Sequence, residues 1–361
     1  MIATIPTLTY LNEKGELTPE YKPTLLLDEI LKCYRIMLLT RHVDDRMITL
    51  QRQGLITFAM SSLGEEACAV GSASALIQTD WMYPQYREAG IMFWRGATIQ
   101  QYVHHMFGDR LDLSLGRQMP NHFGTRALNI VTVSSPIGTK VPHAAGCAYA
   151  MKVQKENNVA ICYFGEGATS EGDFHAGLNF AAVRKAPAIF FCRNNGYAIS
   201  TPCSRQFACD GIASKGTGYG ITTFRIDGND LFAVHDIVKK ARQVCLSGQG
   251  PILIEAMTYR MGAHSTSDDP SLYRKDEEVN SWKEKCPILR LRRYLEKIGQ
   301  WDHAKEERLI KEITDEVSAA IALAKDTPRT PLKYIVEHVY AEVPPKLQAQ
   351  YEELKSFFPG E

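Results

Sequence analysis

Short apolar runs alternate with longer amphipathic segments through the middle of the chain. The amphipathic segments repeat their apolar residues every three or four positions, which predicts helices over residues 142–156, 170–185 and 230–246. Several of the apolar runs are almost continuous, as in strands of a parallel sheet that is covered on both faces. The runs that we interpret as strands are residues 129–135, 159–165, 188–194, 221–228 and 251–259. The alternation predicts an α/β fold with a doubly wound parallel sheet flanked by helices.

Two flanking regions have a different character. Residues 1–40 are expected to form an N-terminal arm that runs into the start of a first helix near residues 25–40. Residues 41–285 contain the strands and are predicted to form the α/β domain. Residues 286–361 are charged with helical periodicity, and we expect them to be a C-terminal helical extension of the same domain.

The overall composition is that of a globular protein with a sizeable core. The chain of 361 residues is 45% hydrophobic and 23% charged, and its formal net charge is zero, so charge gives no reason to expect nucleic acid or membrane as a partner. The nine cysteines are scattered without a C-x-x-C pair, which favours free thiols in a reducing compartment. The first residues have neither the charge nor the apolar run of a targeting peptide, so we expect a cytoplasmic protein.

Polar residues interrupt the pattern after two consecutive strands. Gly165-Glu166-Gly167 follows the run at 159–165, and Asn194-Asn195-Gly196 ends the run at 188–194. The carboxyl ends of parallel strands meet at one edge of a sheet, where open α/β folds bind their ligands. Oxygen donors of this kind suit Mg²⁺, which completes its octahedron with phosphate oxygens and water.

The same stretch supports further detail and one plain alternative. Gly165 and Gly167 would let phosphate groups approach the backbone, next to the positive end of the following helix. Gly196 would let the chain turn so that the carbonyl of Tyr197 also faces inward. The alternative is an ordinary strand–turn–helix without a ligand, because G-x-G turns are common.

The spacing of these motifs brings a resemblance to a known family. "GEG", followed after 26 residues by "NN", resembles the thiamine-diphosphate signature G-D-G…N-N, with Glu in place of Asp. Together with "QRQGLITF", "PQYREAG", "GRQMPNHFG", "TVSSPIGT" and "YRMGAHSTSDD", it resembles the α subunits of the decarboxylase component of branched-chain 2-oxo acid dehydrogenases. The related pyruvate and acetoin enzymes share the signature, but "STSDD" and "CRNNGYAIST" fit the branched-chain group better.

The resemblance implies a thiamine-diphosphate-binding fold and an oxidoreductase. The implied reaction is oxidative decarboxylation of branched-chain 2-oxo acids such as 3-methyl-2-oxobutanoate, with acyl transfer to a lipoyl group of a transacylase. The cofactors would be thiamine diphosphate and Mg²⁺. A glutamate that activates the cofactor would come from a separate β subunit in an α₂β₂ heterotetramer. The alternatives are a pyruvate or acetoin dehydrogenase α subunit, or a non-catalytic module that binds Mg²⁺ and a diphosphate.

The resemblance also assigns individual residues. Glu166, the Asn195 side chain and the Tyr197 carbonyl would hold Mg²⁺; from the residues alone, Asn194 is an equal alternative to Asn195. His264 would be the catalytic residue, since a histidine can move protons near neutral pH. His143 and the pair His104-His105 are expected to be structural. The cofactor contacts implied by the resemblance are Tyr86, Arg87, Ser135, Ile137, Gly167, Ala168, Arg193 and His264.

Two loops depart from the family pattern. Ser134, Pro136 and Thr139 match a loop that holds a monovalent cation, but Lys140 stands where the family has a glutamine and has no acceptor to offer. A K⁺ site is therefore doubtful, and our hypothesis is that the ammonium group replaces the ion. In the segment that kinases modify in mitochondrial relatives, Ser265 is kept and Lys275 replaces the second acceptor. We therefore expect no regulation by phosphorylation, and we interpret the chain as bacterial.

Overall fold

A parallel sheet of six strands organises the chain. The computed structural model describes residues 4–359. The strands follow the order β1-β7-β8-β4-β3-β2, and all neighbours are parallel. They are β1 Thr7–Leu8, β2 Trp81–Tyr83, β3 Ala160–Gly165, β4 Ala188–Asn194, β7 Thr222–Asp227 and β8 Ile252–Met257. This confirms the predicted α/β fold with a doubly wound parallel sheet.

Alternate residues of the central strands face two separate cores. In β3, Ile161 and Tyr163 belong to one cluster of buried side chains, whereas Cys162 and Phe164 belong to the other. The same alternation continues in β4 and β8. Because both faces are covered, the strands show no alternation of apolar and polar residues, which explains the continuous apolar runs in the sequence.

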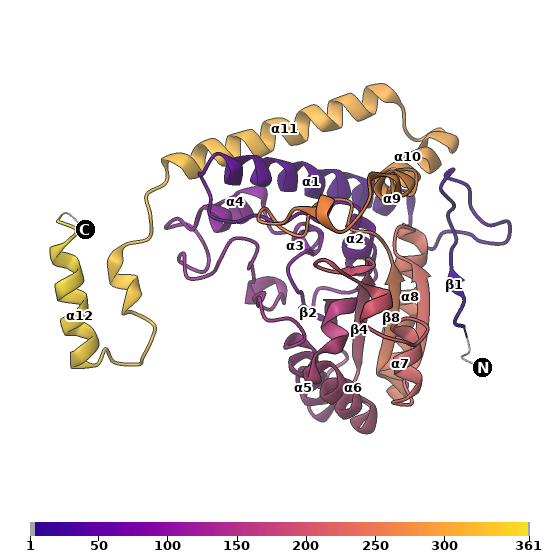
Figure 1. Ribbon diagram of the computed structural model, residues 1–361, viewed down its shortest axis with the longest axis horizontal. Coiled ribbons are helices and arrows are strands. Elements are labelled where there is room, and N and C mark those ends of the chain that lie inside the picture. Colours follow the sequence, from indigo (N-terminus) through magenta and orange to yellow (C-terminus); the bar gives the residue numbers. More distant parts are fainter. Residues whose placement is uncertain (1–3, 360–361) are drawn as a thin grey trace.

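Helices from different parts of the chain cover each face of the sheet (Figure 1). The larger core lies under α1, α2, α8, α10 and α11, and the smaller one lies under α5 and α6. The helices are α1 Leu27–Arg52, α2 Glu66–Ser74, α3 Ala89–Arg95, α4 Ile99–Phe107, α5 Lys140–Val153, α6 Gly172–Arg184, α7 Ala213–Thr217, α8 Leu231–Val244, α9 Asp276–Lys283, α10 Pro287–Lys297, α11 His303–Asp326 and α12 Pro345–Ser356. No helix among residues 4–359 is both long and apolar enough to cross a bilayer.

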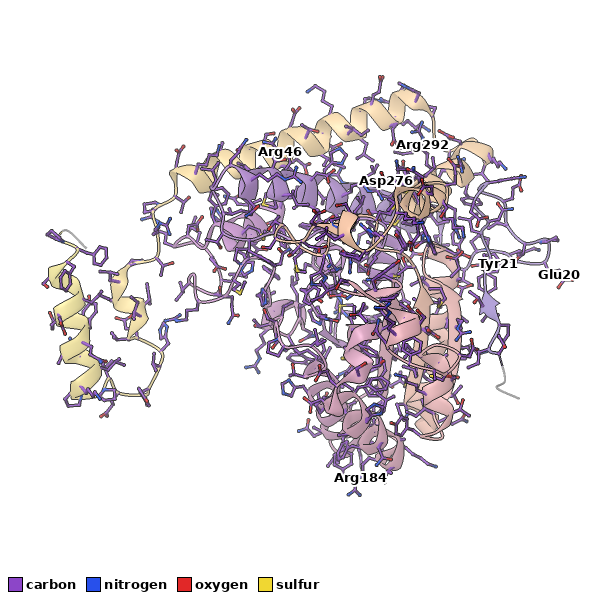
Figure 2. All side chains as sticks on the ribbon, viewed as in Figure 1. Glu20, Tyr21, Arg46, Arg184, Asp276 and Arg292 are labelled. Carbon is purple, nitrogen blue, oxygen red and sulfur yellow. The ribbon has the colours of Figure 1, made fainter. Side chains whose placement is uncertain are left out.

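The C-terminal helices do not form one compact unit. Helix α11 packs along α1, whereas α12 lies away from the sheet, at the far left of Figure 1. In Figure 2, Arg184 at the end of α6 lies at the opposite end of the molecule from Arg46 of α1 and Arg292 of α10. The predicted division at residues 40 and 285 stays a prediction, although α1 already begins at Leu27.

Four of the five predicted strands are present, and the one at residues 129–135 was wrong. There, Val131 donates to the carbonyl of Met82 (2.9 Å) and Ile130 forms only isolated bridges, after which the chain leaves the sheet. Polar residues and Pro136 follow at once, and proline cannot extend a ladder. The pattern missed β1 and β2, since strands of two and three residues are too short to show a periodicity.

A buried histidine in the larger core links stability to pH. His235 of α8 is 4% exposed, its Nδ1 lies 2.7 Å from Ser74 Oγ, and its Nε2 has no partner among the described residues. Burial lowers its pKa from 6.5 to about 4. The folded protein therefore keeps His235 neutral while the unfolded chain takes up a proton. Its contribution to stability is present above about pH 6.5 and is lost as the pH falls toward 4.

We predict that His235→Gln reduces the acid sensitivity of the fold. Between about pH 7 and about pH 5, the free energy of unfolding of the unmodified protein should fall by about 2 kcal/mol more than that of the variant. Urea unfolding at both pH values measures the difference. His143→Gln, which changes an exposed histidine, is the matched control and should behave like the unmodified protein. Equal pH dependence in the unmodified protein and in His235→Gln would contradict this account.

Candidate active site

A cavity of about 340 Å³ lies at the carboxyl ends of β3 and β4. Gly165 ends β3 and Asn194 ends β4, and the parallel register pairs Gly165 with Arg193. The chain turns out of both strands at this edge, so the residues that follow them become cavity walls. The lining residues are Phe58, Met60, Gln85, Tyr86, Arg87, His122, Ser135, Ile137, Gly165, Glu166, Gly167, Ala168, Arg193, Asn195, Tyr197, Ala198, Ile199, Arg260 and His264.

The three residues predicted to hold Mg²⁺ lie together on one wall. Glu166 is 1% exposed, and its Oε2 accepts the backbone N–H of Asn195 at 3.2 Å. The Asn195 side-chain oxygen accepts the N–H of Tyr197 at 3.2 Å. Gly196 has φ +89°, which produces the expected turn. The Tyr197 carbonyl accepts a bond from Arg260 at 3.3 Å and has a second lone pair free for another partner.

The structure gives the two adjacent asparagines different surroundings. Asn194 Nδ2 donates to Glu255 at 2.7 Å, and its Oδ1 accepts the N–H of Gly196 at 3.2 Å. Asn194 does not line the cavity, whereas Asn195 does. The geometry therefore favours Asn195 as the side chain that shares the wall with Glu166.

Close packing explains one of the two glycines around Glu166. A Cβ on Gly167 would lie 2.6 Å from the Cβ of Ala198, which belongs to the short hairpin β5 Tyr197–Ala198 and β6 Thr201–Pro202. At Gly165 the space is open, with the nearest atom 3.9 Å away. Gly167 thus lets the hairpin approach Glu166, a role that the sequence did not suggest.

Arg193 is held by two buried carboxylates. It pairs with Glu65 and Glu88, and all three side chains are at most 2% exposed. Burial works against the charged guanidinium, but Glu88 and Glu65 outweigh it and raise the pKa of Arg193. Burial alone raises the pKa of the Glu65 carboxyl, but Arg193 and Arg87 hold it below its ordinary value. Arg193 is thus a fixed cation in the cavity wall.

Two arginines surround His264. Arg87 donates to His264 Nδ1 at 3.0 Å and to the His264 carbonyl at 2.5 Å, and Arg260 lies 3.5 Å from the same Nδ1. Burial, followed by Arg87 and Arg260, lowers the pKa of His264 from 6.5 to about 4. A guanidinium group only donates, so Nδ1 is the acceptor and the proton of the neutral ring is on Nε2. His264 therefore offers an N–H donor at neutral pH.

A second histidine in the cavity wall went unnoticed in the sequence. His122 Nδ1 lies 3.0 Å from the carbonyl of Pro120, and its Nε2 lies 2.5 Å from Ser135 Oγ. The carbonyl can only accept, so Nδ1 carries the proton and Ser135 donates its hydroxyl hydrogen to Nε2. The other cavity residues that the sequence analysis did not name are Phe58, Met60, Gln85, Ala198, Ile199 and Arg260.

The residues predicted to contact the cofactor and those predicted to hold a monovalent cation lie in different places relative to the cavity. Every residue predicted to contact the cofactor lines the cavity, whereas Ser134, Pro136, Thr139 and Lys140 do not. In that loop, the Thr139 hydroxyl donates to the Pro136 carbonyl at 3.1 Å, and α5 begins at the half-buried Lys140. His104 and His105 are buried and bonded to Asp109 and Asp112, as expected for structural residues.

Comparison with known proteins places the chain in a family. The sequence profile described as "Dehydrogenase E1 component" matches residues 34–333. The chain is 47% identical over 356 residues to the mitochondrial 2-oxoisovalerate dehydrogenase subunit alpha of Macaca fascicularis, covering 98% of this chain and 80% of the relative. The protein of that name from Caenorhabditis elegans is 50% identical over 326 residues, 90% of this chain and 75% of the relative. The alpha 1 subunit of Arabidopsis thaliana is 43% identical over 348 residues, 96% and 74% of the two chains. The chain therefore belongs to the dehydrogenase E1 component family, and its full-length similarity is to the α subunits of 2-oxoisovalerate dehydrogenases.

Proposed function

We propose that this chain is the α subunit of a branched-chain 2-oxo acid dehydrogenase and binds Mg²⁺ and thiamine diphosphate in the cavity. Membership of the E1 family implies thiamine diphosphate. The observation that carries the proposal for the site is the meeting of Glu166 and Asn195, from the ends of two adjacent parallel strands, on one wall of the cavity. Three buried guanidinium groups, those of Arg87, Arg193 and Arg260, line the same space.

The chemistry of the wall fits a divalent cation. Glu166 is a buried carboxylate whose pKa burial raises, and it forms no ion pair with a basic side chain among residues 4–359. A buried charge without a counterion is costly, and a metal ion would remove that cost. Gln206 donates weakly to Glu166 at 3.5 Å, and its own Oε1 is buried with no partner among the described residues. The oxygen donors suit Mg²⁺, and the guanidinium groups suit phosphate.

The residues of this chain would mainly orient the substrate and exclude water, and the bound cofactor would carry the bond-breaking chemistry. When bound, thiamine diphosphate supplies the electron sink for the loss of CO₂. His264, kept neutral by burial and by Arg87, would donate its Nε2 proton as a hydrogen bond toward the reacting oxygen. Phe58, Met60 and Ile199 provide apolar surface that would exclude water and receive a branched aliphatic side chain.

The cavity is incomplete as a catalytic site, which supports a partner. Among the described residues that line it, Glu166 is the only carboxylate, and Glu166 is committed to the metal. We infer that a β subunit supplies the second glutamate in an α₂β₂ enzyme. The lipoyl group of a transacylase would accept the acyl group. We also propose that the protein is located in the cytoplasm.

The substrate class is tested with the assembled enzyme. The chain, co-expressed with its candidate β subunit, should have a kcat/KM for 3-methyl-2-oxobutanoate at least about tenfold above that for pyruvate, because an apolar pocket discriminates by about 10–200-fold per missing methylene. Decarboxylation across a panel of 2-oxo acids measures this ratio. A higher kcat/KM for pyruvate would favour the pyruvate dehydrogenase alternative, and activity on no 2-oxo acid would favour the non-catalytic module.

Removal of the Glu166 charge should abolish metal binding. We predict that Glu166→Gln lowers the affinity for Mn²⁺ by more than about 100-fold, which is the upper end of the losses seen for residues that only support a metal ligand. Titration calorimetry with thiamine diphosphate present measures this affinity. Glu171→Gln, an exposed residue at the start of α6, is the control. Unchanged Mn²⁺ affinity in Glu166→Gln would show that the metal site is elsewhere.

Lys140 should make the enzyme independent of potassium. The apparent affinity for thiamine diphosphate should stay the same when K⁺ is replaced by a bulky organic cation, because the ammonium group would take the place of the ion. Lys140→Gln should bind the cofactor more weakly in the organic cation and recover in K⁺. Lys152→Gln on the same helix controls for the loss of a positive charge. A large loss of affinity without K⁺ in the unmodified enzyme would refute the hypothesis.

A further inference from the structure

Glu65 is a buried carboxylate next to the metal wall that the proposed function does not use. It is the residue before the first turn of α2, it is 1% exposed, and it does not line the cavity. Nonetheless it contacts two residues that do. Its Oε1 accepts from Asn195 Nδ2 at 3.0 Å, and its Oε2 accepts from a terminal nitrogen of Arg193.

The loop that carries Glu65 is fixed on both sides. Before it, Asp44 accepts the N–H and the hydroxyl of Ser62 at 2.7 and 2.6 Å. After it, Glu66 pairs with Arg41 at 2.6 Å. Gly64 between them has φ +95°, and a Cβ there would lie 2.3 Å from the carbonyl oxygen of Tyr259. Such a loop leaves the Glu65 carboxylate little freedom to move.

The chemistry of the Glu65–Asn195 contact selects one orientation of the amide. The two ends of an asparagine side chain have nearly the same shape, but one end donates and the other accepts. A carboxylate between guanidinium groups is ionised and can only accept, so it must face the NH₂ end. The oxygen end of Asn195 is then turned away from Glu65, where it accepts from Tyr197 N–H.

We infer that Glu65 is a positioning residue for the metal site: it fixes the Asn195 amide with its oxygen available to the divalent cation. This inference rests on the proposed Mg²⁺ site. A glutamine at position 65 could donate as well as accept, so it would allow the amide to turn over and present NH₂ to the metal. Outer-shell partners of metal ligands typically contribute about 10–100-fold to metal affinity.

Arg193 offers the competing explanation, because Glu65 also pairs with it. Glu88 provides the matched control: it pairs with Arg193 on the other side, accepts the N–H of Gln85 at 2.9 Å, and makes no hydrogen bond to Asn195. Glu88→Gln therefore weakens the ion pair with Arg193 but leaves the orientation of the Asn195 amide, which Glu65 determines, unchanged. An effect that passes through Arg193 would be of similar size in Glu88→Gln and Glu65→Gln.

The test is the affinity for Mn²⁺, followed by electron paramagnetic resonance, in the assembled enzyme with thiamine diphosphate present. We expect Glu65→Gln to lose about 10–100-fold in Mn²⁺ affinity and Glu88→Gln to lose much less. Circular dichroism and thermal unfolding establish that each variant is folded. The double variant Glu65→Gln/Asn195→Asp should recover affinity, because the introduced carboxylate would offer an oxygen in either orientation while the introduced amide donates to the other oxygen.

Each outcome bears on a different claim. If the unmodified enzyme does not bind Mn²⁺, the proposed metal site itself is wrong. If it binds Mn²⁺ and Glu65→Gln binds it equally well, the role of Glu65 is wrong while the site stands. Equal losses in the two single variants, without recovery in the double variant, would assign the effect to Arg193 and also overturn the inference.

Discussion

The parallel register of β3 and β4 is the constraint on which the rest of the site depends. It pairs Gly165 with Arg193. Glu166, one residue after Gly165, and Asn195, two residues after Arg193, therefore leave the sheet side by side at the same edge. Glu166 and Asn195 are in contact for that reason. A shift of the register by one residue would turn each strand residue to the opposite core and separate the two oxygen donors. The two buried cores, which interlock with alternate side chains of both strands, oppose such a shift.

Buried charge is the second common feature of this site. Arg87 and Arg193 are almost fully buried, and each has a different set of partners: carbonyl oxygens and a neutral imidazole for Arg87, carboxylates for Arg193. Fixed cations in a low-dielectric wall suit an anionic ligand, because they need little reorganisation when the ligand binds. Burial, together with Arg87 and Arg260, lowers the pKa of His264 and keeps its ring neutral. The site thus combines a carboxylate, Glu166, that suits a cation with guanidinium groups that suit an anion. This combination matches the charges of a metal ion bound to a diphosphate.

The fold and the positions of the proposed metal ligands could be predicted from the sequence. The features that the sequence did not reveal were missed for physical reasons. The β3–α6–β4 unit and the two polar interruptions after its strands are local signals, so the fold and the positions of Glu166 and Asn195 followed from the order of residues. Glu65 and Glu88 could not be found in this way. Glu65 meets Arg193 and Asn195 across 128 and 130 residues of sequence, and "GEEACAV" reads as an ordinary helix start. The strand predicted at residues 129–135 is absent because Ile130 forms only two isolated bridges, to Met82 and Thr125, and Pro136 follows before a ladder can develop.

The central claim is that one divalent ion is held between Glu166 and Asn195. A crystal structure of the assembled enzyme with thiamine diphosphate and Mn²⁺, with anomalous scattering recorded for manganese, tests it most directly. The account predicts one strong anomalous peak per chain, within about 2.3 Å of both a Glu166 oxygen and Asn195 Oδ1, with the Tyr197 carbonyl, diphosphate oxygens and water as the remaining ligands. A peak bonded to only one of these side chains, or at another position in the cavity, would contradict it.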